Sequence, residues 1–181
     1  MDERLDWEAA LAATGVTVKV DRSVRLVALR YFDAGGFGER LRTALGEGIP
    51  APLGFNRGRY GAAEDPFMLV WRSPTECWLL SATAAPIEAI SREIAGFGDA
   101  CLIDQTGGIL ALRVEGSRTL DLLHRLGSVD SVPRAGEAST GRFADISVTA
   151  VGLATTEFLM LVERGHVVHL LGWIRETLTD F

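Results

Sequence analysis

The chain has 181 residues, a length that suits one domain or two small lobes sharing a core. Its net charge is −6, with acidic and basic residues interspersed and no basic stripe, so we expect no nucleic-acid partner. Hydrophobic residues make up 48% of the chain, enough for a full core and a surplus that indicates a partner surface. The N-terminus shows no secretory signal and the chain has no stretch of about 18 apolar residues, so we expect a cytoplasmic protein without membrane contact.

Residues 1–24 are predicted to form an N-terminal arm and a short strand. The segment Asp6–Thr14 predicts a short helix with Trp7 and Leu11 on one face. Val16–Val20 alternates between apolar and polar residues, which predicts a short strand.

The segment from Arg25 to Asp104 predicts the order strand, helix, strand, strand, helix, strand. The signals are alternation in the strands, apolar spacing of three or four in the helices, and a proline suited to a first helical turn. The elements are expected at Arg25–Phe32, Phe37–Leu45, Phe67–Arg72, Glu76–Ser81, Pro86–Ile94 and Cys101–Asp104.

Between the first helix and the hairpin lies a stretch without periodicity, Gly46–Pro66, which is rich in glycine and proline. Long structureless loops in compact domains are usually functional or disordered. The aromatic and arginine residues of FNRGRY suit contact with a partner or an anionic ligand, and we single out Asn56, Arg57 and Arg59 as partner contacts. A solvated connection is an equally weighted alternative.

The segment Asp104–Leu126 predicts a strand-turn-helix unit, with Gly107 and Gly108 in the turn and Ser117 as the helix N-cap. After a second loop, alternation predicts a strand over Arg142–Val151 with one wet face. Its hairpin partner is expected at Glu157–Val162, followed by a long helix with the apolar stripe Val167, Leu170, Leu171, Ile174 and Leu178.

Two short matches point to an internal duplication. VALR at Val27–Arg30 corresponds to LALR at Leu110–Arg113, and ECWLL at Glu76 corresponds to EFLML at Glu157, both at a spacing of about 80 residues. We therefore predict an α+β protein built from two ferredoxin-like units, strand-helix-strand-strand-helix-strand, over about 25–104 and 109–181.

No catalytic constellation is visible in the sequence. His166 and His169 lie one helical turn apart near Glu163, but a metal site needs a fuller ligand set and an ordinary helix face is favoured. Cys77 and Cys101 are predicted to be buried small hydrophobes. We accordingly predict no catalytic residue and no metal ligand, and assign no cofactor-binding residue.

Three runs carry a family resemblance: MLVWRSPTECWLL, IDQTGGILALRVEGSRTLDLLHRLGSVD and FLMLVERGHVVHLLGWI. They resemble the gamma subunit family of heterotetrameric sarcosine oxidase, within the wider group of glycine-cleavage aminomethyltransferase-like folate-binding folds. The resemblance covers residues 25–181, and the loop with Pro50 and Pro52 followed by Asn56 is similar as well.

The resemblance implies an aminomethyltransferase folate-binding-domain-like fold and a non-catalytic subunit of an oxidoreductase complex. That complex carries out oxidative demethylation of sarcosine or a related N-methyl amine, and this chain stabilises its other subunits. The resemblance also implies that this chain binds no cofactor. Flavins, NAD and tetrahydrofolate are expected on the partner alpha, beta and delta subunits. Two alternatives stay open: a stand-alone folate-binding or one-carbon transfer protein of the same fold, and a homo-oligomeric scaffold.

Overall fold

The computed structural model describes residues 10–181 and confirms an α+β fold with two antiparallel sheets and four α-helices in that part of the chain. The chain divides into two compact units. The first unit is Ser23–Gly107, and the second joins Gly108–Phe181 to the described residues up to Arg22. No helix in the described residues is both long and apolar enough to cross a membrane.

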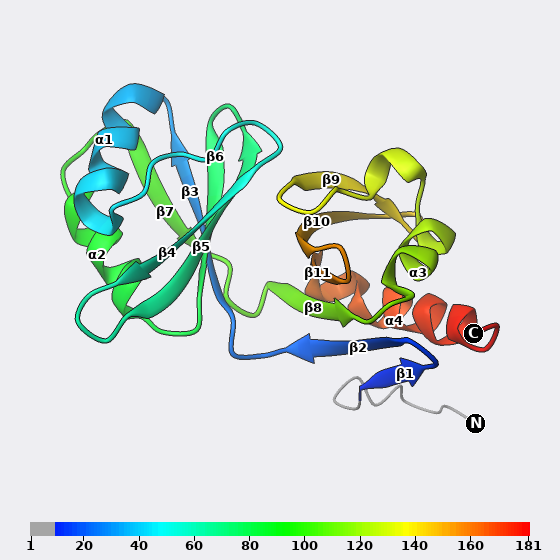
Figure 1. Cartoon of the computed structure of the whole chain (residues 1–181). Coiled ribbons are helices and arrows are strands. Elements are labelled where there is room, and N and C mark those ends of the chain that lie inside the picture. The colour runs from blue at the N-terminus through cyan, green and yellow to red at the C-terminus, as the bar shows by residue number, and fades with distance from the viewer. Residues whose placement is uncertain (1–9) are drawn as a thin grey trace. The chain divides into compact units, whose positions relative to one another are not determined.

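The first unit is a five-stranded sheet with two helices on one face (Figure 1). With β4 set aside, the order β7-β3-β6-β5 is that of a ferredoxin-like sheet, as the duplication predicts. Its elements are β3 (Arg25–Tyr31), α1 (Ala34–Leu45), β4 (Phe55–Tyr60), β5 (Asp65–Ser73), β6 (Glu76–Ser81), α2 (Ala85–Glu93) and β7 (Ala100–Asp104).

The core of the first unit forms between α1, α2 and the helix-covered face of the sheet. The side chain of Asp33 caps α1 by accepting a hydrogen bond from the Gly36 amide at 3.0 Å. Phe37 and Leu41, one helical turn apart, are fully buried. The ring of Tyr31 stacks on Phe37 with centroids 4.6 Å apart, which joins the end of β3 to the helix.

The expected long loop over Gly46–Pro66 is wrong in its second half, because Phe55–Tyr60 is strand β4 at the edge of the sheet. Arg57 lies opposite Met68 in β5, and Asn56 lies opposite Leu69. The strand lacks apolar alternation because it is an edge strand with a glycine and two arginines, so its sequence carries little strand signal.

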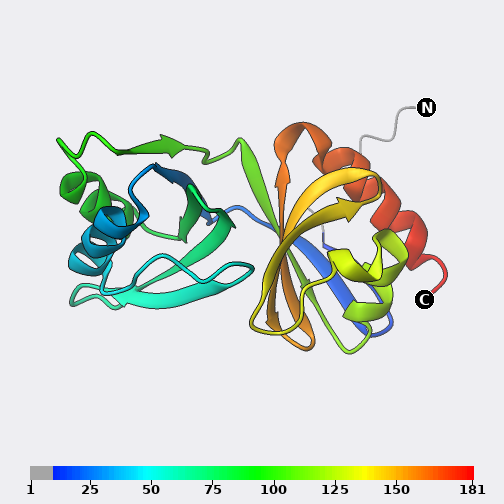
Figure 2. The same ribbon diagram turned by 90° about the horizontal axis from the view of Figure 1, so that it is seen from above.

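The second unit is a six-stranded sheet in the order β1-β2-β8-β11-β10-β9, with α3 and α4 packed on it (Figure 2). Strand β2, from the N-terminal part of the chain, pairs with β8 and takes the place that β7 has beside β3 (Figure 1). The elements are β1 (Leu11–Ala13), β2 (Val16–Asp21), β8 (Ile109–Glu115), α3 (Thr119–Leu126), the short 3₁₀ helix η1 (Val129–Ser131), β9 (Ala138–Phe143), β10 (Ile146–Ala154), β11 (Glu157–Glu163) and α4 (Arg164–Leu178).

The N-terminal prediction needs correction. Residues 6–9 of the predicted helix lie outside the described residues, and Leu11–Ala13 is strand β1 rather than helix. It pairs with β2 through a turn in which Gly15 adopts a φ of +80°. The apolar spacing that predicted a helix also fits this short strand, because three residues are too few to distinguish a helical repeat from the alternation of a strand.

Two further local predictions are wrong. Ser117 is not the N-cap of α3, since Arg118 occupies that position without a side-chain hydrogen bond to the helix. The strand expected over Arg142–Val151 is broken by a turn at Ala144 and Asp145, whose φ angles are +47° and +63°. Arg142 and Phe143 are therefore the last two residues of the preceding strand β9.

The core of the second unit combines β2, β8, β10 and β11 with the inner faces of α3 and α4. Val18 of β2 and Leu112 of β8 are fully buried. The predicted stripe of the last helix is confirmed, because all five of its residues are buried: Val167, Leu170, Leu171, Ile174 and Leu178.

Candidate interaction surfaces

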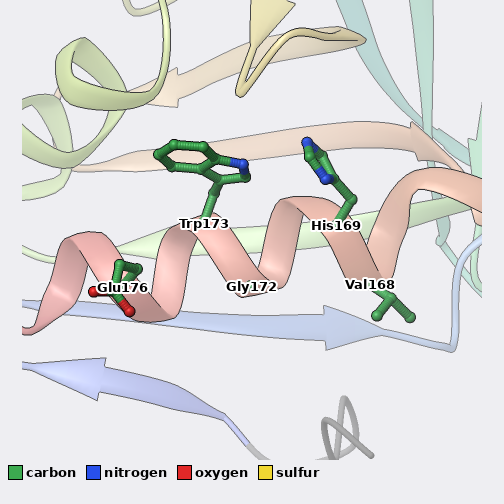
Figure 3. A pocket seen from close by; sticks show the side chains of 5 residues that line it. All are labelled: Val168, His169, Gly172, Trp173 and Glu176. Atoms are coloured by element: carbon green, nitrogen blue, oxygen red, sulfur yellow. The ribbon is translucent and has the colours of Figure 1, made fainter.

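The outer face of α4 carries a shallow groove of about 340 Å³ lined by Val168, His169, Gly172, Trp173 and Glu176 (Figure 3). Val168 and Trp173 are 57% and 53% exposed, although both are large apolar residues. They lie on either side of the helix, outside the buried stripe, so packing within the unit does not require them to be apolar.

The groove is suited to contact rather than to catalysis. The Nε2 atom of His169 lies 3.0 Å from the carbonyl oxygen of Ala144, which fixes the ring against the β9–β10 turn. Gly172 leaves open space between His169 and Trp173, since a Cβ atom there would meet nothing within 4 Å. An exposed tryptophan is among the residue types that are enriched in protein interfaces.

A second hollow, of about 550 Å³, lies beside α3 and the following loop. Leu120 and Val129, which line it, are 39% and 72% exposed. The remaining lining residues mix charged and apolar side chains: His124, Asp130, Val132, Pro133, Arg134, Ala135, Glu137, Thr155 and Phe158. The carboxylate of Glu137 accepts a hydrogen bond from the Arg134 amide at 3.1 Å, which holds the loop that forms one wall.

The three predicted partner contacts all lie on β4. Asn56 donates to the Gly48 carbonyl at 3.1 Å and faces the helix-covered side of the sheet, opposite Leu69. Arg57 and Arg59 point to the other face, because side chains alternate along a strand. Asn56 therefore anchors the preceding loop, whereas the two arginines remain the predicted contacts.

Each of these arginines already has a contact within its own unit. The guanidinium of Arg57 lies over the Phe55 ring, 5.3 Å from the centroid. Arg59 donates to the Glu64 carbonyl at 3.2 Å, across the β4–β5 turn. Both residues would bring a pre-positioned positive charge to a partner.

A charged and aromatic cluster at the β5–β6 hairpin escaped the sequence analysis. Glu76 accepts from Arg30 Nε at 2.7 Å and from Trp78 Nε1 at 2.9 Å. The guanidinium of Arg72 lies 4.1 Å from the centroid of the Trp78 ring. Burial of this guanidinium lowers the pKa of Arg72. The sequence shows only that Glu76 and Trp78 are two residues apart and so share a face of a strand. Their proximity to Arg30 depends on the register of β3 and β6.

The candidate metal ligands do not converge. His166 lies 3.9 Å from Glu163, and His169 is committed to the Ala144 carbonyl. Among residues 10–181 no three His, Cys, Asp or Glu side chains are placed to hold a metal ion together. Asp104 is the last residue of β7, and its carboxylate accepts from the Thr106 amide at 2.8 Å. This bond lowers the pKa of Asp104.

The two cysteines differ in environment. Cys77 is fully buried as predicted, and burial raises its pKa to about 12, so its thiol is protonated at neutral pH. Cys101 is exposed on β7, contrary to the prediction. It lies at a sheet edge, where a strand has fewer neighbours than its apolar sequence indicates.

Comparison with solved structures identifies the same fold in two proteins. A chain of heterotetrameric sarcosine oxidase from Corynebacterium sp. U-96, in complex with pyrrole 2-carboxylate, matches with a TM-score of 0.79 at 19% identity. The alignment covers 94% of this chain and 87% of that one. The glycine cleavage system aminomethyltransferase T from Bartonella henselae matches with a TM-score of 0.68 at 14% identity, over 88% of this chain.

The two matches differ in extent. This chain spans 45% of the aminomethyltransferase but most of the sarcosine oxidase chain. No family model and no curated protein matches the sequence. The comparisons therefore show the fold of this chain.

Proposed function

We propose that this chain is the non-catalytic gamma subunit of a sarcosine oxidase-like complex, which oxidatively demethylates sarcosine or a related N-methyl amine. The observation that carries the proposal is the fold match over nearly the whole of both chains. The alignment covers most of each chain, so the matched subunit is of similar size. Flavins, NAD and tetrahydrofolate would be bound by the partner alpha, beta and delta subunits.

The exposed apolar side chains support an accessory role. Trp173 and Val168 on α4, and Leu120 and Val129 beside α3, project from a unit whose core is already complete. Aromatic and apolar residues surrounded by charged ones are typical of the centre of a protein interface. In the proposed complex these surfaces would pack against the larger subunits.

The test is affinity purification of the tagged chain from its native host at endogenous expression, with a visible spectrum of the eluate. We expect larger partner chains in fixed stoichiometry and flavin absorption. Trp173→Ala should reduce the recovered flavin protein, because it removes the largest exposed apolar side chain of the α4 groove. Ser91→Ala, an exposed change on α2 in the other unit, is the matched control. A colourless chain recovered alone would contradict the proposal.

A stand-alone folate-binding protein is the second candidate. The observations that favour it are the fold shared with aminomethyltransferase T and the 550 Å³ hollow, a size within the range of small-molecule sites. Calorimetric titration of the isolated chain with tetrahydrofolate distinguishes the two candidates. Saturable binding that Arg134→Ala weakens would favour this function, whereas no heat of binding would leave the subunit role.

A further inference from the structure

We propose that the open edge of β7 binds an extended strand of a partner subunit, one with an apolar centre and basic ends. The proposal rests on the proposed function for the identity of the partner. Its basis in the fold is independent, because the second unit of this chain shows the same edge already covered by a strand.

The two sheets correspond strand by strand. Strands β4, β5, β6, β3 and β7 of the first match β9, β10, β11, β8 and β2 of the second. In the second sheet an additional strand, β1, pairs antiparallel with β2 in the register Leu11 to Val18. In the first sheet no described strand pairs with the outer side of β7. The internal repeat thus shows which kind of element this edge accepts.

The hydrogen-bond pattern identifies the groups that β7 offers. The backbone N–H of Phe32 donates to the carbonyl of Asp99 at 2.9 Å, and the N–H of Gln105 donates to the carbonyl of Leu26 at 2.9 Å. Both are therefore hydrogen-bonded pairs of the β3–β7 ladder. In an antiparallel ladder bonded and non-bonded pairs alternate. Leu102, opposite Leu29, therefore directs its N–H and C=O away from β3, towards the open edge.

The composition of β7 is that of a strand meant to be covered. Its sequence is ACLID, yet none of its residues is buried. Edge strands that stay in solvent usually carry lysine, proline or a bulge, and β7 has none of these. Phe32, whose amide bonds to the start of the strand, is 87% exposed. The edge is therefore apolar over the first four residues of β7, Ala100 to Ile103.

Charge favours a basic partner over a second copy of this chain. Asp99 and Asp104 stand at the two ends of the edge, both exposed. The Thr106 hydrogen bonds that lower the pKa of Asp104 keep it ionised. If two copies paired antiparallel about Leu102, Asp99 would lie opposite Gln105 and Asp104 opposite Ala100, so neither carboxylate would lie opposite a cationic residue. A segment with Lys or Arg at both ends of an apolar stretch complements both carboxylates.

The decisive variant is Leu102→Pro, because proline removes the outward N–H and leaves the bonds to β3 in place. Leu102→Ala is the matched control, since it shortens the side chain but keeps that N–H. In the complex purified with the tagged chain, we expect Leu102→Pro to weaken retention of the partner about tenfold and Leu102→Ala to leave it within about threefold. Thermal melting of both variants shows whether the fold persists.

Hydrogen exchange supplies the second readout. The Leu102 and Asp104 amides should exchange rapidly in the isolated chain and become protected in the complex. A complex that forms without protecting them, or that tolerates folded Leu102→Pro, would overturn the edge proposal while the proposed function stands.

If the wild-type chain recovers no complex, the proposed function fails and the edge is tested separately with a labelled peptide, Gly-Lys-Val-Leu-Val-Val-Lys-Gly, whose lysines lie opposite Asp104 and Asp99 when its leucine pairs with Leu102. Fluorescence anisotropy should then show binding to wild type and to Leu102→Ala, and its loss in Leu102→Pro. Absence of wild-type binding to this peptide, or equal binding by all three chains, would overturn the proposal.

Discussion

Gly58 is a residue of β4 whose missing side chain leaves room for a neighbouring ring. A Cβ atom built there would lie 2.3 Å from the Phe67 ring, which is 4% exposed and part of the core. We expect Gly58→Val to lower the free energy of unfolding by about 2 kcal/mol, because the buried ring must shift. Denaturant titration measures this change.

Gly172→Ala is the control with opposite sign. A Cβ atom there meets nothing within 4 Å, and alanine stabilises the interior of a helix relative to glycine. The free energy of unfolding should therefore rise by about 0.5–1 kcal/mol. Equal unfolding midpoints for Gly58→Val and wild type would show that the Phe67 ring adapts freely.

Cys77 makes stability depend on pH in the alkaline range. Its pKa is raised from 9.0 to about 12 by burial, so above pH 9 the unfolded chain releases a proton that the folded chain retains. The unfolded state is then favoured, and the free energy of unfolding should fall by up to about 1.4 kcal/mol for each pH unit above that point. Below pH 9 this thiol contributes no slope.

Denaturant titrations between pH 8 and pH 10.5 measure this loss, with Cys77→Ala as the matched variant. The variant should show a shallower decline, although Tyr31 adds a loss of the same sign because its pKa is also raised by burial. Identical pH profiles for the two proteins would contradict the assignment.

At the scale of elements, the strand pairs β3–β6 and β8–β11 repeat one ion pair with different surroundings. Arg30 bonds Glu76 at 2.7 Å in the first unit, and Arg113 bonds Glu157 at 2.6 Å in the second. The registers differ, because Arg30 lies directly opposite Glu76 while Arg113 lies opposite Leu159. The sequence correspondence therefore marks a shared contact rather than an identical ladder.

Glu76→Ala should cost more stability than Glu157→Ala. Glu76 has 18% of its side chain exposed, and its loss leaves Trp78 Nε1 without its acceptor, at a cost of about 1–2 kcal/mol. Glu157 is 36% exposed, and Arg113 keeps Asp21 at 3.3 Å, so that cost should stay below about 1 kcal/mol. Thermal unfolding of the two variants compares them, and a larger loss for Glu157→Ala would refute the ranking.

The elements that the sequence predicted well are those with many buried apolar residues. Alternation located β3 and β8, an apolar run located β11, and the stripe of α4 matched its buried residues. The elements missed or misread, β4, β9 and β1, are edge strands with polar or small residues. Edge strands bury less, so selection for apolar alternation on them is weaker.

The candidate surfaces were less predictable than the fold. Asn56, Arg57 and Arg59 drew attention by composition in an expected loop, yet register placed them on a strand. Trp173 and Val168 carry no signal of exposure, since a helix that is apolar on several sides is read as buried. The open edge of β7 cannot be found from local sequence, because it depends on which distant strand fails to pair.

For the whole molecule, the two copies of the repeat differ in chain connectivity. The first unit is continuous in sequence, whereas the second includes β2, which precedes the first unit in the chain. The segment 1–24, expected as an arm and a short strand, thus includes a strand of a central ladder: Val16 and Val18 are 2% and 0% exposed. Folding of the second unit must therefore close a chain loop of the whole first unit, which costs entropy.

This chain connectivity predicts which unit loses amide protection when a core residue is substituted. Val18 belongs to the core of the second unit and Val27 to that of the first, although they lie on consecutive strands, β2 and β3. Val18→Ala should lower stability by about 2 kcal/mol and reduce amide protection mainly in 108–181. Val27→Ala should reduce protection mainly in 23–107. Native-state hydrogen exchange resolves the two patterns, and loss of protection across both units from either change would show that they open as one cooperative body.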